Sequence, residues 1–161
     1  MRGFYRRAAY GVEGLRFSLD DIEHGVLRAN KGFPWLPGPH FRDGDPRLDA
    51  IVPTVDARIH FALNCGAASC PPIHAYSVEA IHGQLEQAVG AFLPGEEGVK
   101  VDLEARHVEL PKLMQWFESD FGGQRGAITF AAEFLEDEAA RALLMGADVR
   151  VWYRSYDSAA V

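Results

Sequence analysis

The sequence has little cysteine, no long apolar run and no excess of positive charge. Its 161 residues include only two cysteines, Cys65 and Cys70, too few for a disulfide framework in a chain of this length. No apolar run approaches the roughly 18 residues of a membrane span. The net charge of −7 argues against a nucleic-acid binder, which needs a basic surface for phosphates. We therefore expect no membrane span and no nucleic-acid partner.

Motifs for cofactors and metals are missing as well. No G-x-G-x-x-G motif follows a strand, and no G-x-x-x-x-G-K loop is present to hold a phosphate. The six histidines are scattered without H-x3-H or H-E-x-x-H spacing, and a single C-x4-C pair suits zinc poorly. We expect no cofactor and no metal. The N-terminus has no apolar stretch behind its charges, so we predict no signal peptide and a cytoplasmic location.

Composition and length instead indicate one ordinary soluble domain covering residues 1–161. The chain is 48% hydrophobic and 24% charged, as globular proteins are. Short strands and helices alternate irregularly, which favours an α+β fold with a small antiparallel sheet packed against helices. The expected elements are hairpins over 8–17 and 99–110, helices over 19–28, 77–92, 112–117, 128–135 and 138–144, and strands over 58–64 and 149–153.

Residues 30–53 form a long segment rich in proline and glycine. A connection of this length without regular structure is typically functional or wraps the fold. The simpler alternative is a surface excursion, and both interpretations stay open.

The two cysteines lie in and after the predicted strand 58–64. Cys65 ends that strand, and the following small residues can bring backbone N–H groups close to a ligand, so Cys65 is the candidate nucleophile. Cys70 precedes Pro71, which restricts it to an extended conformation and favours a packed or supporting thiol. Strand alternation places His60 opposite Phe61, where we expect a half-buried structural histidine.

The first predicted helix begins at Ser18, whose hydroxyl can accept from the N–H three residues on. Within this helix Asp20, His24 and Arg28 fall in one row at successive i, i+4 positions. Such a row is typical of a solvated helix face. If it faces a cleft instead, His24 is a candidate acid or base, because its charge changes near neutral pH. Glu23 lies nearer the apolar edge.

Three blocks of the sequence resemble the bacterial domain of unknown function 547 family: SLDDIEHGVLR at 18–28, RIHFALNCGAASCPPI at 58–73 and KLMQWFESDF at 112–121. The resemblance implies a cysteine and histidine site with Cys65 and His24 on the matching positions. It also implies a papain- or transglutaminase-like arrangement, permuted because histidine precedes cysteine. It further implies that the chain lacks the family's N-terminal helix and keeps only part of its closing pattern, in residues 156–158.

These observations give a first hypothesis, a thiol-dependent hydrolase or acyl transferase acting on a small molecule or peptide. Cys65 attacks a carbonyl, His24 takes and returns the proton, and Glu23 or Asp20 orients the imidazole. Arg28 stabilises the thiolate. Further supporting residues are His60, Asn64, Ser69 and Cys70.

Two rival hypotheses belong to other classes. One is a thiol–disulfide redox protein that uses Cys65 and Cys70, which requires Cα atoms within about 7 Å. The other is a protein-binding module without turnover, with residues 30–53 as its contact surface. The sequence does not define the substrate or the oligomeric state.

Overall fold

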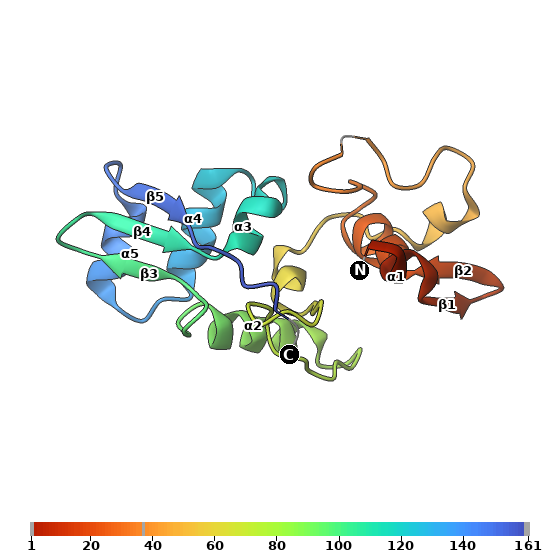
Figure 1. The fold of residues 1–161 in the computed structure, drawn as a ribbon, viewed down its shortest axis with the longest axis horizontal. Helices are drawn as coiled ribbons and strands as arrows, with labels where there is room; N and C mark the ends of the chain where they lie inside the picture. The colour runs from red at the N-terminus through yellow and green to blue at the C-terminus, as the bar shows by residue number, and fades with distance from the viewer. Residues whose placement is uncertain (1, 37, 160–161) are drawn as a thin grey trace. The chain divides into compact units, whose positions relative to one another are not determined.

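The computed structural model describes residues 2–36 and 38–159. The chain divides into two compact units, Met1–Asp56 and Ala57–Val161, called below the N-terminal and C-terminal units (Figure 1). Each unit is described by itself. The prediction of a single domain stays a prediction.

The N-terminal unit begins with a short helix and a hairpin. Helix α1 (Arg2–Arg7) leads into strands β1 (Ala9–Val12) and β2 (Leu15–Ser18), which pair antiparallel. The turn residues Glu13 and Gly14 both have positive φ, 51° and 81°, as the tight turns that match strand twist require. The predicted hairpin over 8–17 is confirmed.

The predicted helix over 19–28 is present, but most of it is a π-helix, η1 (Asp21–Leu27). Its wider turn is seen in the bond from the Asn30 N–H to the Gly25 carbonyl, five residues back, at 2.7 Å. Ser18 caps its start: the Asp21 N–H donates to the Ser18 hydroxyl at 3.1 Å, and the Ser18 N–H donates to the Asp21 carboxylate at 2.8 Å. The expected cap is thus confirmed.

In the described part of the segment, residues 30–36 and 38–53, there is one regular element, the 3-10 helix η2 (Pro46–Ala50). Within this segment, Phe41 packs against η1 and is bonded by Asn30. The Asn30 amide exchanges two hydrogen bonds with the backbone of Phe41, at 3.1 and 2.7 Å. The Phe41 ring is buried beside Gly25, where an added Cβ would lie 2.3 Å from the ring. Close packing therefore explains the glycine in the middle of η1.

The C-terminal unit packs helices against a three-stranded sheet (Figure 1). Its elements, in chain order, are η3 (Ala57–Phe61), α2 (Ile81–Phe92), β3 (Lys100–Asp102), β4 (His107–Leu110), α3 (Lys112–Trp116), η4 (Glu118–Asp120), α4 (Gln124–Glu133), α5 (Glu138–Met145) and β5 (Arg150–Tyr153). Strand β4 lies between β3, with which it is antiparallel, and β5, with which it is parallel. The α+β class is confirmed, with one mixed sheet and one antiparallel hairpin.

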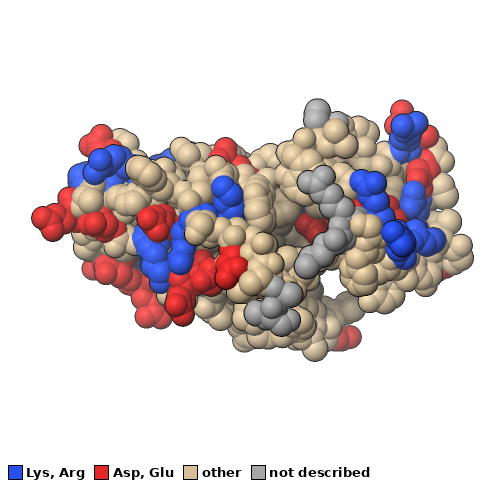
Figure 2. All heavy atoms as spheres, in the orientation of Figure 1, with Lys and Arg blue, Asp and Glu red and all other residues tan. Residues whose placement is uncertain are grey.

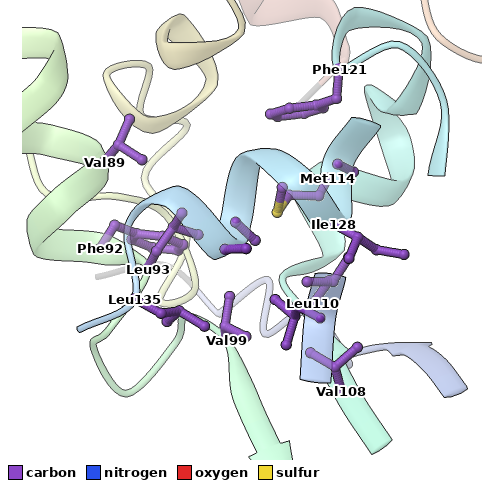
Figure 3. Close-up of a cluster of buried hydrophobic side chains, with 14 of the residues drawn as sticks. Val89, Phe92, Leu93, Val99, Val108, Leu110, Met114, Phe121, Ile128 and Leu135 are labelled. Atoms are coloured by element: carbon purple, nitrogen blue, oxygen red, sulfur yellow. The ribbon is translucent and has the colours of Figure 1, made fainter. Parts of the chain in front are cut away.

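The core of the C-terminal unit lies between α2, α4 and the sheet (Figure 3). Side chains with no exposed surface come from separate parts of the chain: Phe61, Val89, Leu93, Val108, Leu110, Met114, Ala127, Ala131 and Leu144. At roughly 25 cal/mol per Å² of apolar surface removed from water, each larger member contributes on the order of 2 kcal/mol. This core anchors the segment that leads into the cysteines.

The predicted strand over 58–64 is wrong, because the segment forms the 3-10 helix η3 and a following turn. Three successive side chains, Ile59, His60 and Phe61, are all buried, whereas a strand would alternate. The segment contacts α2 rather than a neighbouring strand.

The start of the next helix also differs from the sequence expectation. Helix α2 begins at Ile81, with Ala80 at its N-cap, three residues after the cap predicted at Ser77. Val78, expected on the apolar face, is exposed. The hairpin over 99–110, the helices over 112–117, 128–135 and 138–144 and the strand over 149–153 are confirmed within a few residues at their ends.

Candidate functional site

The cysteine loop, residues 62–72, follows η3 in the C-terminal unit and brings the two thiols together. The Sγ atoms of Cys65 and Cys70 lie 2.9 Å apart, and no disulfide joins them in this structure. Gly66, with φ of +80°, supplies the left-handed turn that folds the loop back. The exposed Cys65 and the half-buried Cys70 thus form one dithiol site.

Asn64 holds the two ends of this loop together. Its side-chain nitrogen donates to the Pro71 carbonyl at 2.6 Å, and its side-chain oxygen accepts from the Gly66 N–H at 2.6 Å. Asn64 therefore fixes the backbone on either side of the thiols, and its supporting role in a reaction stays a prediction.

Tyr156, near the C-terminus, places its hydroxyl 3.1 Å from each of the two sulfurs. Sequence reasoning did not include it among the site residues, because its contacts lie 91 and 86 residues away along the chain. The only indication of Tyr156 in the sequence was the part of the family's closing pattern that residues 156–158 keep. The ring of Trp116 packs on Tyr156, with ring centroids 4.7 Å apart.

A short C-terminal segment, residues 154–159, carries Tyr156 and pairs with the cysteine loop. The N–H of Ala68 donates to the Ala159 carbonyl at 2.9 Å, and the N–H of Asp157 donates to the Ser69 hydroxyl at 3.0 Å. Ser69 in turn donates to Glu97 at 2.9 Å. Ser69 thus holds this segment against the cysteine loop, and its supporting role in a reaction stays a prediction.

The backbone N–H groups of the loop do not form the open oxyanion site expected from the sequence. Those of Gly66 and Ala68 donate to Asn64 and Ala159. The Cys65 N–H donates to the Cys70 sulfur at 3.1 Å, and the Ala67 N–H is directed to the sulfurs. The Cys65 and Ala67 N–H groups therefore stabilise a thiolate on the protein, and those of Gly66 and Ala68 are bonded to oxygens of the protein.

The two thiols differ in acidity. Burial raises the pKa of Cys65, and its hydrogen bond to Cys70 raises it further. Burial acts in the same direction on Cys70, but hydrogen bonds from the Cys65 thiol, the Tyr156 hydroxyl and the Cys65 N–H outweigh it and lower the pKa of Cys70. The first proton to leave the pair therefore leaves a thiolate on Cys70. Burial and the two sulfurs raise the pKa of Tyr156, so its phenol remains a donor.

His24 lies in η1 of the N-terminal unit, and 5% of its surface is exposed. Its ring packs on Phe33, with centroids 4.3 Å apart. The Nδ1 atom is 3.8 Å from the Glu23 carboxylate and 3.5 Å from the Arg28 guanidinium. Glu23 is therefore the acid beside His24, as one form of the first hypothesis expects.

The row of Asp20, His24 and Arg28 is not the solvated helix face that such spacing typically indicates. His24 and Arg28 are buried, and Arg28 donates to the carbonyl of Gly32. The Asp20 carboxylate lies 3.6 Å from Arg6. The row is covered because Gly32 and Phe33, which follow η1 in the chain, contact Arg28 and His24.

His60 is more buried than the half-buried position predicted for it. Its Nε2 atom is 3.0 Å from the Asp120 carboxylate, and neither side chain is more than 1% exposed. The imidazole stacks on Phe117 at 3.9 Å between centroids. This pair lies among core side chains of the C-terminal unit, where a structural role fits it best.

The predicted site residues thus fall into two groups. Those of the cysteine loop, together with Tyr156, meet in the C-terminal unit. His24, Glu23, Asp20 and Arg28 belong to the N-terminal unit, and the Cys65–His24 pair stays a prediction.

Within residues 2–36 and 38–159, no group of three His, Cys, Asp or Glu side chains is arranged to hold a metal ion. Over the same residues, no helix is long and apolar enough to cross a membrane.

Comparison with known proteins gives a family and no described activity. The family model described as "Protein of unknown function, DUF547" matches residues 1–93, which include η1 and the cysteine loop. Neither a curated protein nor a solved structure matches the chain. The papain- or transglutaminase-like arrangement therefore stays a prediction.

Proposed function

The chain belongs to the DUF547 family, a membership that assigns no reaction, and from the geometry of its thiol site we propose that it is a thiol–disulfide redox protein. The observation that carries the proposal is the 2.9 Å separation of the Cys65 and Cys70 sulfurs. This distance is already shorter than an ordinary sulfur contact, and a disulfide requires only a further approach to about 2.05 Å.

Donors around the sulfurs support the same chemistry. A dithiol reacts through its thiolate, and here the Tyr156 hydroxyl and the Cys65 N–H stabilise negative charge on Cys70. Because the Gly66 and Ala68 N–H groups are bonded within the protein, an acyl intermediate would find few donors in this loop. Thiol exchange needs no hydrogen-bond donors other than those that stabilise the thiolate.

The proposed reaction reduces an external disulfide, R–S–S–R′. The Cys70 thiolate attacks one sulfur, so that a bond from Cys70 to the R sulfur forms and R′–S⁻ leaves. Cys65 gives its proton to the released thiolate and attacks the Cys70 sulfur, which expels R–S⁻ to take a proton from water. Two thiols are oxidised to one disulfide, and the external disulfide is reduced to two thiols.

The test is oxidation of the full chain by oxidised glutathione, followed by mass spectrometry. We expect the protein to become lighter by two hydrogen atoms and to yield a peptide cross-linked between Cys65 and Cys70. In a Cys65→Ser variant the reaction should stop at one glutathione adduct on Cys70. An intact protein that accumulates a stable glutathione adduct, or that stays fully reduced, would contradict the proposal.

The second candidate is the thiol-dependent hydrolase or acyl transferase, with Cys65 as nucleophile and His24 as base. It is supported by the Glu23 carboxylate 3.8 Å from the buried His24 ring, since an acid beside an imidazole can orient it. Its test is the rate at which iodoacetamide alkylates Cys65 at pH 6. The hydrolase requires Cys65 to react faster than a free thiol, and a His24→Gln variant to lose that advantage.

A further inference from the structure

Residues 73–77, called the extended segment below, follow the cysteine loop in the C-terminal unit and lie open to solvent. They run on from Pro71 and Pro72 without helix, turn or bend, and the two prolines hold φ near about −65°, which favours an extended chain. Every side chain in the segment is exposed except that of Tyr76, which is half-buried. The dithiol is therefore followed at once by an exposed, extended stretch of backbone.

One edge of the extended segment is bonded to α2 and the other is open. The Gln84 side chain donates to the Ala75 carbonyl at 3.2 Å and accepts from the Ser77 N–H at 2.8 Å. Because alternate residues of an extended chain direct their N–H and C=O groups to the same edge, those of His74 and Tyr76 lie on the opposite edge. Within residues 2–36 and 38–159, the backbone of His74 and Tyr76 makes no hydrogen bond. Such an edge is a template for a second extended chain.

The neighbouring cysteine loop already pairs with one extended chain. The Ala68 N–H donates to the Ala159 carbonyl at 2.9 Å, and the Ser69 N–H donates to the Asp157 carbonyl at 3.3 Å. Residues 157–159 thus use the backbone of the loop but leave that of the extended segment unpaired.

The open edge is close enough to the thiols for a bound chain to reach them. Cys70 precedes His74 by four residues, and an extended chain spans at most about 3.6 Å per residue, so their Cα atoms lie within about 14 Å of each other. A chain paired with His74 and Tyr76 advances at the same rate along the segment. Its residue three or four positions further on therefore lies beside Cys70.

The charge of the C-terminal unit favours a basic partner. Residues 57–161 include fifteen acidic and eight basic side chains, so this unit carries the whole net charge of −7, and Figure 2 shows acidic groups over the end that holds β3 and α5. Near the dithiol the charges balance: Glu97 and Asp157 contact Ser69, and Lys112 and Arg154 line a small hollow with Tyr156. The excess therefore attracts a basic chain at long range and does not define one ion pair.

We propose that the disulfide substrate of this protein is carried by an extended, basic peptide segment, which pairs its backbone with the open edge at His74 and Tyr76 and presents its disulfide to Cys70. This inference rests on the proposed redox function and names its substrate class. Ile73, which is 81% exposed, offers an apolar surface to side chains beside the substrate cysteine. A small disulfide such as oxidised glutathione has no strand to pair with the segment.

The experiment mixes the reduced full chain with the blocked peptide acetyl-Lys-Val-Val-Cys-Val-Val-Lys-amide, whose cysteine carries thionitrobenzoate in a mixed disulfide. The Cys70 thiolate attacks the peptide sulfur, and thionitrobenzoate leaves and is measured by its absorbance. Cys65 then loses its proton to the buffer and attacks the Cys70 sulfur, and the peptide leaves as a thiolate that the buffer protonates. Two protein thiols become one disulfide, and the mixed disulfide becomes two thiols.

Two altered peptides separate backbone pairing from charge. Each rate is divided by the rate of the same peptide with dithiothreitol, which corrects for the reactivity of the disulfide itself. We expect a peptide with N-methylated valines to react at least about tenfold more slowly than the parent, because several backbone hydrogen bonds are lost. A peptide with glutamates in place of the lysines should react about threefold more slowly at low salt, a difference that about 1 M salt removes. An N-methylated peptide as fast as the parent, or a glutamate peptide faster than the parent, would overturn the proposal.

Two substitutions at one position locate the pairing edge. His74→Pro should slow the parent peptide about threefold to tenfold, because proline fits an extended chain but cannot donate a backbone hydrogen bond. His74→Ala keeps the N–H and should leave the rate within about twofold of wild type. A His74→Pro variant as fast as wild type, or equal losses in both variants, would place the peptide elsewhere and overturn the proposal.

Oxidised glutathione distinguishes failure of this proposal from failure of the redox function. If the redox function holds, glutathione forms the Cys65–Cys70 disulfide whether or not the extended segment binds peptides, and it also checks that His74→Pro keeps an intact dithiol. A chain that glutathione oxidises, but that does not discriminate between the parent and N-methylated peptides, is a redox protein without this peptide site. A chain that neither glutathione nor the peptide oxidises refutes both proposals.

Discussion

Removing one oxygen from Tyr156 tests whether the Tyr156 hydroxyl makes the dithiol acidic. In Tyr156→Phe the ring can still pack on Trp116, but the donor 3.1 Å from both sulfurs is lost. A hydrogen bond to a charged group is worth roughly 1.5–3 kcal/mol. Since Cys65 is exposed and the site is partly screened by water, the lower end of this energy range applies. At 1.36 kcal/mol per pKa unit, the thiolate pKa should rise by about one unit.

The assay measures alkylation of Cys70 by iodoacetamide as a function of pH, with the modified peptide identified by mass spectrometry. A rate at one pH would understate the effect, because a thiolate of higher pKa is also more nucleophilic, with a Brønsted slope of about 0.4–0.5. Roughly a tenfold loss of thiolate would then appear as only about a threefold loss of rate. The midpoint of the full profile gives the pKa without this compensation.

Tyr153→Phe is the matched control. Its hydroxyl donates to Glu118 at 2.9 Å rather than to a sulfur, and we expect the Cys70 midpoint to stay within about 0.3 units, a small fraction of the shift expected for one hydrogen bond. If the Tyr156→Phe and wild-type profiles coincide, the hydroxyl does not stabilise the thiolate. If both tyrosine variants shift equally, the change is a general effect on the C-terminal unit.

Three further predictions concern stability and use urea unfolding. Gly25→Ala should destabilise the N-terminal unit by about 1–2 kcal/mol, because the added Cβ meets the Phe41 ring at 2.3 Å. An unchanged urea concentration at the unfolding midpoint would contradict this packing. Phe61→Ala should lower the free energy of unfolding of the C-terminal unit by about 3–5 kcal/mol, because it leaves a cavity at a fully buried position. A decrease of less than about 1 kcal/mol would contradict the place of Phe61 in the core. Burial raises the pKa of Asp21, but hydrogen bonds from His40 and Ser18 outweigh it, and the pKa is lowered. The contribution of Asp21 to the free energy of unfolding is therefore fully present above its pKa in the unfolded chain, near 3.9, and is lost as the pH falls through its pKa in the folded protein. Asp21→Asn should therefore be less stable than wild type at pH 7, and the gap should narrow below about pH 4.

Local signals in the sequence were sufficient where neighbouring residues determine the structure. Glu13-Gly14 predicted the first hairpin, because both turn positions need positive φ. Ser18 predicted the start of η1, because its hydroxyl meets an N–H only three residues on. The period of apolar residues likewise located α2 and α5, apart from their ends.

The sequence did not predict the features of the structure that depend on residues far apart in the chain. Ile59 and Phe61 alternate with polar residues as in a strand, yet His60 is buried because Asp120 accepts from it 60 residues away. No residue within 58–64 indicates that Asp120 is the partner of His60. The assignment of the more acidic thiol to Cys70 depends on the hydrogen bond between the two thiols and on the bond from the Cys65 N–H to the Cys70 sulfur, and the spacing of the cysteines does not show either bond.

The reach of Tyr156 has a consequence for how the chain folds. Cys65 and Cys70 are five residues apart, whereas the contact from Tyr156 to Cys65 closes a loop of 91 residues. Loop-closure entropy makes the longer closure costlier by on the order of 2–3 kcal/mol. We therefore expect the thiols to meet before the tyrosine joins them. In a refolding experiment, a chain caught between these events would carry an assembled sulfur pair without the Tyr156 hydroxyl. The pKa of Cys70 would then lie above its value in the folded protein, because one of the hydrogen bonds that lower it is missing, and thiol reactivity would report the final docking of residues 154–159.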